Sequence, residues 1–263
     1  MYNSVPSVSD FFLKELIAEL DNDTVRGIVL GGSHARGDST PYSDVDLACF
    51  VQDTFRLLRK RYLYREGHLI SIGQKTLEGV KQQITEPFQA LWIVPGFRQA
   101  RVLLDKDGSM RQLKQIVEHF TWDPLRSEAL GYVGHILTSD AEYVHKLLGN
   151  IWRGNPSGIA YSVQRLFDSA TMAMTLYYGV FITNDNVYFQ EVEAAVGTDS
   201  TWTHYHCLLS GIKTIDEDTS SLDARAKLAL RLYRETASLL LPTLNDQCYA
   251  VVEHVLNLIE QSF

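Results

Sequence analysis

The stretch Gly31-Gly32-Ser33-His34-Ala35-Arg36-Gly37-Asp38, followed by Ser43-Asp44-Val45-Asp46-Leu47, decides how this chain folds. Apolar residues lie on either side of it. The run 25–30 predicts one short strand, and the run 45–51 predicts a second. The sequence therefore predicts a strand, a glycine turn, the start of a helix, and a strand that carries two acids.

The glycine turn has the residues that a phosphate site needs. Gly31 and Gly32 let the backbone turn sharply and approach a bulky anion. Ser33 can cap the following helix and offer a hydroxyl to a phosphate oxygen. Arg36, one turn further on, can add a charge-assisted contact. The pattern is neither a P-loop nor a dinucleotide fingerprint, because the required glycines and lysine are missing or wrongly placed.

Asp44 and Asp46 are candidate metal ligands. Side chains alternate across a strand, so the two carboxylates point to one face. Like charges this close repel, and a divalent cation removes that cost. Mg²⁺ prefers a few carboxylates with phosphate oxygens and water. Alone, such a turn or such an acid pair is usually an ordinary surface feature. In this order they predict Mg²⁺-assisted chemistry on a nucleoside triphosphate.

At these residues the sequence resembles the nucleotidyltransferase superfamily related to polymerase β. The pattern G-G-S-x-A-R-G-x(5)-S-D-x-D-L is similar to the small-molecule branch, which holds the aminoglycoside and lincosamide nucleotidyltransferases and the minimal bacterial ones. The motif covers about residues 25–52, with a looser similarity to about 120. The resemblance implies an α+β fold, in which a mixed sheet with flanking helices precedes an all-α helical bundle.

The resemblance also implies transfer of a nucleoside monophosphate, most often AMP from ATP, to a hydroxyl. It assigns Mg²⁺ and catalysis to Asp44 and Asp46. The nucleotide-binding candidates are Gly32, Ser33, Arg36 and Ser43.

Many relatives carry a third carboxylate on the next strand, but the predicted strand 68–74 contains none; Glu66 and Glu78 flank it. We therefore look for the general base in the second domain, across a cleft between the domains. Asp168 is the first candidate, because it is placed on the apolar stripe of a helix over 158–178. An unpaired acid is costly to bury there. A structural pair with Arg165 is the alternative. Further candidates are Glu142, Glu191 and Glu193.

Periodicity and turn residues divide the chain into an α/β domain at 1–120 and a helical bundle of about five helices at 121–263. Trp122-Asp123-Pro124 marks the boundary. Predicted strands lie near 25–31, 44–51, 68–74 and 101–105. Predicted helices lie at 8–20, after Ser33, at 53–63, across 76–100 and at 108–120. Ser7 or Ser9 is the expected cap of the first helix, and Pro87 and Pro95 limit the helices across 76–100.

Composition narrows the class of partner. The net charge of −8 argues against nucleic acid as a partner, and the basic run 56–61 is interpreted as a solvated helix face. The three cysteines show no pairing or metal spacing, which fits a cytoplasmic location. His204 and His206 are expected on a loop or helix surface rather than at a metal. No run is long enough for a membrane span. A homodimer is left open.

Three functions follow. The first is an enzyme that transfers AMP from ATP to a hydroxyl of a small molecule, such as an aminoglycoside-like sugar whose amines suit an acidic protein. The second is an antitoxin-like enzyme that transfers AMP to a protein side chain. The third is a nucleotide-binding regulatory protein without catalysis, which the missing third acid favours.

Overall fold

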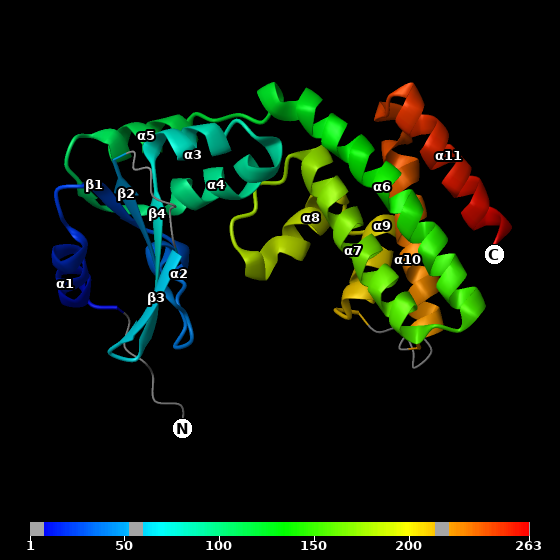
Figure 1. Cartoon of the computed structure of the whole chain (residues 1–263), viewed down its shortest axis with the longest axis horizontal. Coiled ribbons are helices and arrows are strands. Elements are labelled where there is room, and N and C mark those ends of the chain that lie inside the picture. Colours follow the sequence, from blue (N-terminus) through cyan, green and yellow to red (C-terminus); the bar gives the residue numbers. More distant parts are fainter. Residues whose placement is uncertain (1–7, 53–59, 214–220, 263) are drawn as a thin grey trace. The chain divides into compact units, whose positions relative to one another are not determined.

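The computed structural model describes residues 8–52, 60–213 and 221–262. The chain divides into two compact units, residues 1–121 and 122–263. Figure 1 labels the helices and strands of each.

The first unit contains a five-stranded mixed sheet of order β3-β4-β2-β1-β5. The strands are β1 (Val25–Leu30), β2 (Val45–Val51), β3 (Lys60–Arg65), β4 (His68–Lys75) and β5 (Arg101–Asp105). β1 lies antiparallel to both β2 and β5, whereas β4 runs parallel to β2 and antiparallel to β3. The predicted mixed sheet is therefore confirmed.

Strand β3 corrects the sequence analysis, which placed a helix over 53–63. Lys60 and Arg61 lie on this strand rather than on a solvated helix face, and residues 53–59 lie outside the described part of the chain. Tyrosines at 62 and 64 favour a strand. Glu66 and Gly67 both have positive φ angles, 51° and 82°, and make a two-residue hairpin turn into β4.

Helix α1 (Asp10–Leu20) covers one face of the sheet. Phe12, Leu13 and Leu16 pack into a core with apolar residues of β1, β2 and β4. Ser9 is the N-cap, as predicted, because its hydroxyl accepts a hydrogen bond from the Phe12 N–H at 3.1 Å. Ser7, the other predicted cap, lies outside the described residues.

The other face is covered by α4 (Pro87–Gln99) and α5 (Ser109–Glu118), with α3 (Leu77–Gln83) preceding them (Figure 1). The rings of Phe50 on β2 and Phe97 on α4 lie 5.7 Å apart. Pro87 begins α4 as predicted, but Pro95 lies inside the helix instead of limiting it. Val94, Pro95 and Phe97 are buried, and their packing offsets the helix hydrogen bond that the proline cannot donate.

The second unit is helical, as predicted. Its helices are α6 (Arg126–Arg153), α7 (Pro156–Tyr178), α8 (Tyr188–Val196), α9 (Thr201–Ser210), α10 (Leu222–Leu240) and α11 (Asp246–Gln261). In Figure 1, α6 lies along α7, with α10 and α11 beside them. Among the described helices of the chain, none combines the length and the apolar character that a membrane crossing needs.

Candidate functional site

The glycine turn meets the acid pair because β1 and β2 are antiparallel neighbours. The last β1 residue, Leu30, pairs with Leu47, and the Gly31 N–H then donates to the Asp46 carbonyl at 2.8 Å. Short helix α2 (Gly32–Arg36) starts here. Its N-cap is Gly31, so the prediction that Ser33 caps it is wrong.

Gly32 cannot be replaced without moving the acid. Its φ is +61°, a left-handed conformation that side chains disfavour. A Cβ atom at this position would lie 2.5 Å from Oδ2 of Asp46. The Gly32 backbone therefore lies directly against the Asp46 carboxylate. The predicted approach of this turn to a phosphate stays a prediction.

The charge of Asp44 acts on the Asp46 carboxylate. Burial raises the pKa of half-buried Asp46, and the charge of Asp44 raises it further, while Lys60 and a hydrogen bond with Ser71 oppose the rise. The described residues contain no cluster of three or more His, Cys, Asp or Glu side chains able to hold a metal. A pair of carboxylates is a ligand set that suits Mg²⁺, because this ion completes its shell with phosphate oxygens and water.

Strand β4 supplies no acid to this face. Its register against β2 pairs Asp46 with Ser71, Ala48 with Gly73 and Phe50 with Lys75, so that Ser71, Gly73 and Lys75 share the face of Asp46. Glu66 lies in the hairpin turn, 3.9 Å from Arg65, and Glu78 pairs with Lys81 at 3.0 Å. The third carboxylate that many relatives carry on this strand is therefore missing from β4, as the sequence indicates.

A cavity of about 490 Å³ opens on this face. Its size is typical of small-ligand sites. Glycines 31, 32, 73 and 96 and Asp46 form part of its wall, two lysines come from β3 and β4, and two aromatic rings come from α4. The lining residues include Gly32, Asp46, Lys60, Lys75, Trp92 and Phe97.

The residues predicted to bind nucleotide or metal make up only part of the wall of this cavity. Of the predicted nucleotide and metal residues, all of which are described, Gly32 and Asp46 line it. Arg36 donates to Asp38 at 3.1 Å, and the Ser43 hydroxyl accepts from the Thr40 N–H at 2.9 Å. Like Ser33 and Asp44, these residues are not among the lining residues. Roles for Ser33, Arg36 and Ser43 in nucleotide binding, and for Asp44 as a metal ligand, stay predictions.

His34 was not predicted. Its imidazole is hydrogen-bonded to the backbone of Ser43, and burial lowers its pKa, as does His68. The charges of Asp44 and Asp46 reach it and oppose this shift. Its Nε2 atom is buried and has no hydrogen-bond partner among the described residues. His34 therefore adds a partly buried imidazole, whose charged form burial disfavours, to the surroundings of the acid pair.

Asp168, the predicted base, does not lie on the apolar stripe of its helix. It is exposed on α7 and accepts a hydrogen bond from Gln164 at 2.8 Å. Among the described residues of this unit, the acid that is buried is Asp140 on α6, which was not predicted. Burial raises the pKa of Asp140 to about 7, against a hydrogen bond from Ser169 and the charge of Arg165. A catalytic role for Asp168 stays a prediction.

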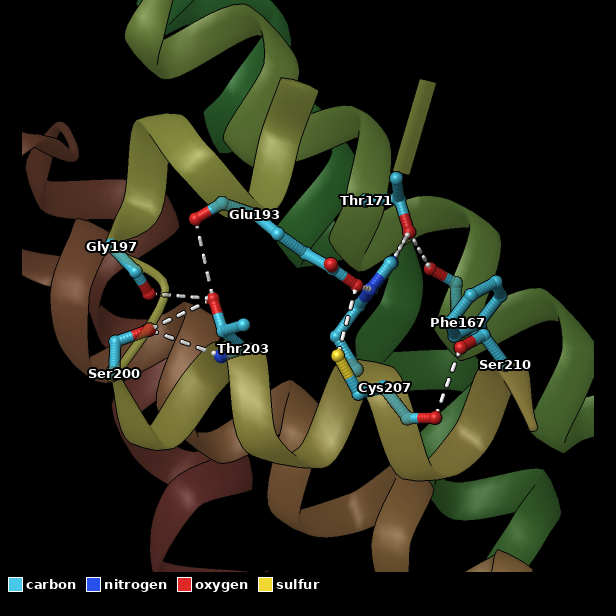
Figure 2. A network of polar contacts seen from close by, with 9 residues as sticks. Phe167, Thr171, Glu193, Gly197, Ser200, Thr203, Cys207 and Ser210 are labelled. Carbon is cyan, nitrogen blue, oxygen red and sulfur yellow. Dashed lines mark hydrogen bonds and ion pairs between the residues drawn. The ribbon is translucent and has the colours of Figure 1, made fainter. Parts of the chain in front are cut away.

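The other predicted bases have structural partners. Glu142 pairs with Lys146 at 2.6 Å, and Glu191 accepts from the Thr183 N–H at 3.1 Å. Glu193 accepts from the Cys207 thiol at 3.3 Å and lies 2.7 Å from Nδ1 of His206. Figure 2 shows its side chain reaching toward Cys207.

His206 is fully buried, not on a helix surface as predicted. Its Nε2 lies 3.0 Å from the Thr171 hydroxyl, beside Phe167 in the network of Figure 2. Its ring is stacked between Phe167 and Trp202, with centroids 4.7 and 4.6 Å away. Glu193 and His206 therefore link α7, α8 and α9 to one another.

Comparisons with known proteins agree with this geometry. Residues 13–86 match the model of a family described as the nucleotidyltransferase domain. A nucleotidyltransferase-like protein from Exiguobacterium sibiricum has a similar fold, with a TM-score of 0.51 and 13% sequence identity over 88% of this chain and 74% of that one. No curated protein matches. The chain thus carries a nucleotidyltransferase-type domain with a nucleotidyltransferase-like fold.

Proposed function

We propose that this protein is a Mg²⁺-dependent nucleotidyltransferase that transfers AMP from ATP to a hydroxyl of a small molecule, such as an aminoglycoside-like sugar. One observation carries the proposal. The Gly31 N–H donates to the Asp46 carbonyl at 2.8 Å, which sets the glycine turn against Asp46 at the wall of a cavity of about 490 Å³. The family match over residues 13–86 spans both motifs.

In this proposal the chain's own residues bind and orient the reactants. Gly32 lets the phosphates approach the backbone, with Ser33, Arg36 and Ser43 as further predicted contacts. Asp44 and Asp46 would hold Mg²⁺, whose chemistry is to neutralise phosphate charge as pyrophosphate leaves. Trp92 and Phe97 line the same cavity and offer ring surfaces to the base. Rate enhancement then comes mainly from positioning and charge neutralisation.

The test is pyrophosphate release from each nucleoside triphosphate in the presence of Mg²⁺ and a panel of hydroxyl-rich compounds, aminoglycosides among them. We expect Asp44→Ala and Asp46→Ala to abolish turnover while the circular dichroism spectrum is unchanged. Asp10→Asn is the matched control, because this acid is 87% exposed in the first turn of α1. Turnover near the wild-type rate in either alanine variant would refute the site.

A second function is favoured by one observation: β4 presents serine, glycine and lysine, and no carboxylate, on the face of Asp46. A nucleotide-binding regulatory protein needs only the cavity. Such a protein binds Mg²⁺ and triphosphate with the same dependence on Asp46 but releases no pyrophosphate with any acceptor. Binding and turnover measured on the same sample separate the two functions.

A further inference from the structure

We propose that Lys60 and Lys75 bind the phosphates beyond the α-phosphate, so that strands β3 and β4 select a nucleoside triphosphate over a monophosphate. The proposal rests on the proposed nucleotide site and names two residues that neither the motif nor the family match assigns. It also gives β4 a role that its lack of a carboxylate leaves open.

The sheet register sets both lysines on the face of the acid pair. Gly73 on β4 pairs with Ala48 on one side and with Lys60 on the other. Lys75 pairs with Phe50, two residues further along β4. Because side chains alternate along each strand, Lys60 and Lys75 share the face of Asp46, and all three line the same cavity.

Small residues keep the floor between these charges open. Ala48 and Gly73 occupy the row between Asp46 and Lys75, and both line the cavity. Lys75 lies four positions beyond Ser71, the partner of Asp46, along β4, a distance of about 13 Å at the usual rise of a strand. A lysine side chain at one end and a row of phosphates starting at Asp46 together cover that distance.

The charges in the cavity are unbalanced at the lysine end. The Lys60 charge acts on Asp44 and Asp46, and its Nζ lies 5.0 Å from the ring centre of Tyr62. Lys75 is half-buried, and among the described residues no carboxylate forms an ion pair with it. Burial lowers the pKa of Lys75, and the neighbouring charge of Lys60 lowers it further. A multiply charged anion between the two ammonium groups removes this repulsion.

Arg36, the cation that the motif predicts for phosphate, is less available. It is held by Asp38 at 3.1 Å and is not among the lining residues of the cavity. The cations that do line it come from a hairpin whose first strand was not predicted from the sequence. Phosphate binding would therefore use lysines as point charges rather than the bidentate contact that arginine makes.

The experiment measures dissociation constants of ATP, ADP and AMP in Mg²⁺ by calorimetry for the full chain and its variants. We expect Lys75→Met to weaken ATP binding by about tenfold or more, as for a lost charge-assisted contact. The loss should shrink for ADP and be near zero for AMP. Lys60→Met should give a smaller loss in the same order, because Lys60 is exposed.

Two controls make the result specific. Lys81→Met removes a lysine of the same unit that pairs with Glu78, and it should leave all three constants unchanged. Lys75→Arg keeps the charge and should restore most of the ATP affinity, which excludes misfolding as the cause of the loss in Lys75→Met. Equal losses for ATP and AMP, or no loss in Lys75→Met, would overturn the lysine assignment alone. If the wild-type chain binds none of the three, both this inference and the proposed function are wrong.

Discussion

Replacing Gly32 by alanine should disable the site while barely changing the fold. Alanine at a φ of +61° costs about 1–2 kcal/mol of folding free energy. Its Cβ atom would lie 2.5 Å from Oδ2 of Asp46, whereas ordinary contacts begin near 3.4 Å. The carboxylate must therefore move by about 1 Å, and a misplacement of that size at a reacting centre can cost on the order of 100-fold in rate.

Gly37→Ala is the matched control for this prediction. Gly37 ends the same short helix with a φ of +84°, but a Cβ atom there would meet nothing within 4 Å. Both variants should lose similar stability in urea unfolding. Only Gly32→Ala should lose Mg²⁺-dependent binding of ATP, measured by calorimetry, and any pyrophosphate release. If the two variants lose binding equally, or if neither does, the close approach of Gly32 to Asp46 has no part in function.

Three further predictions concern the helical unit. Asp140→Asn should flatten the pH dependence of stability. The pKa of Asp140 is about 7 in the folded chain and near 3.8 in the unfolded chain, so the wild type loses roughly 2–3 kcal/mol of stability from pH 5 to 7.5. Urea unfolding at both pH values should show this loss in the wild type and not in the variant. Glu193→Ala should destabilise the unit by about 1–3 kcal/mol, since buried Nδ1 of His206 loses its partner; protection of α9 amides from hydrogen exchange should drop, and unchanged protection would contradict this. Gly179→Ala, whose Cβ would lie 2.3 Å from the Trp122 ring, should lower the melting temperature more than Gly211→Ala, which meets nothing.

The sequence is sufficient where the determinants are local. The apolar runs around the motif predict β1 and β2, and the serine before the first helix predicts its cap. Gly32 and Asp46 were predicted because a short motif contains both. Strand β3 was missed because leucine, lysine and arginine around it favour a helix. Its hairpin turn uses Glu66-Gly67 instead of the usual Asn-Gly or Asp-Gly.

The remaining site residues depend on strand register, which no local pattern specifies. Lys60 and Lys75 enter one cavity only because β4 lies between β3 and β2. The buried acid is a different case, because the signal was present. Asp140 follows Val133 by seven residues and Leu137 by three, which places it on the buried stripe of α6. Asp168 follows exposed Gln164 and Arg165 by four and three residues, which places it on the solvent face of α7.

The hydrogen bond between Gly31 and Asp46 joins two points that are distant along the chain but adjacent in the sheet. The segment between α2 and β2, residues 37–44, returns the chain to the start of β2 and ends with Ser43 and Asp44. Residues can be inserted early in this segment, before Thr40, without displacing the pairing of β1 with β2. Distant homologues can therefore differ in the length of this connection, and a search pattern with a fixed spacing would overlook them.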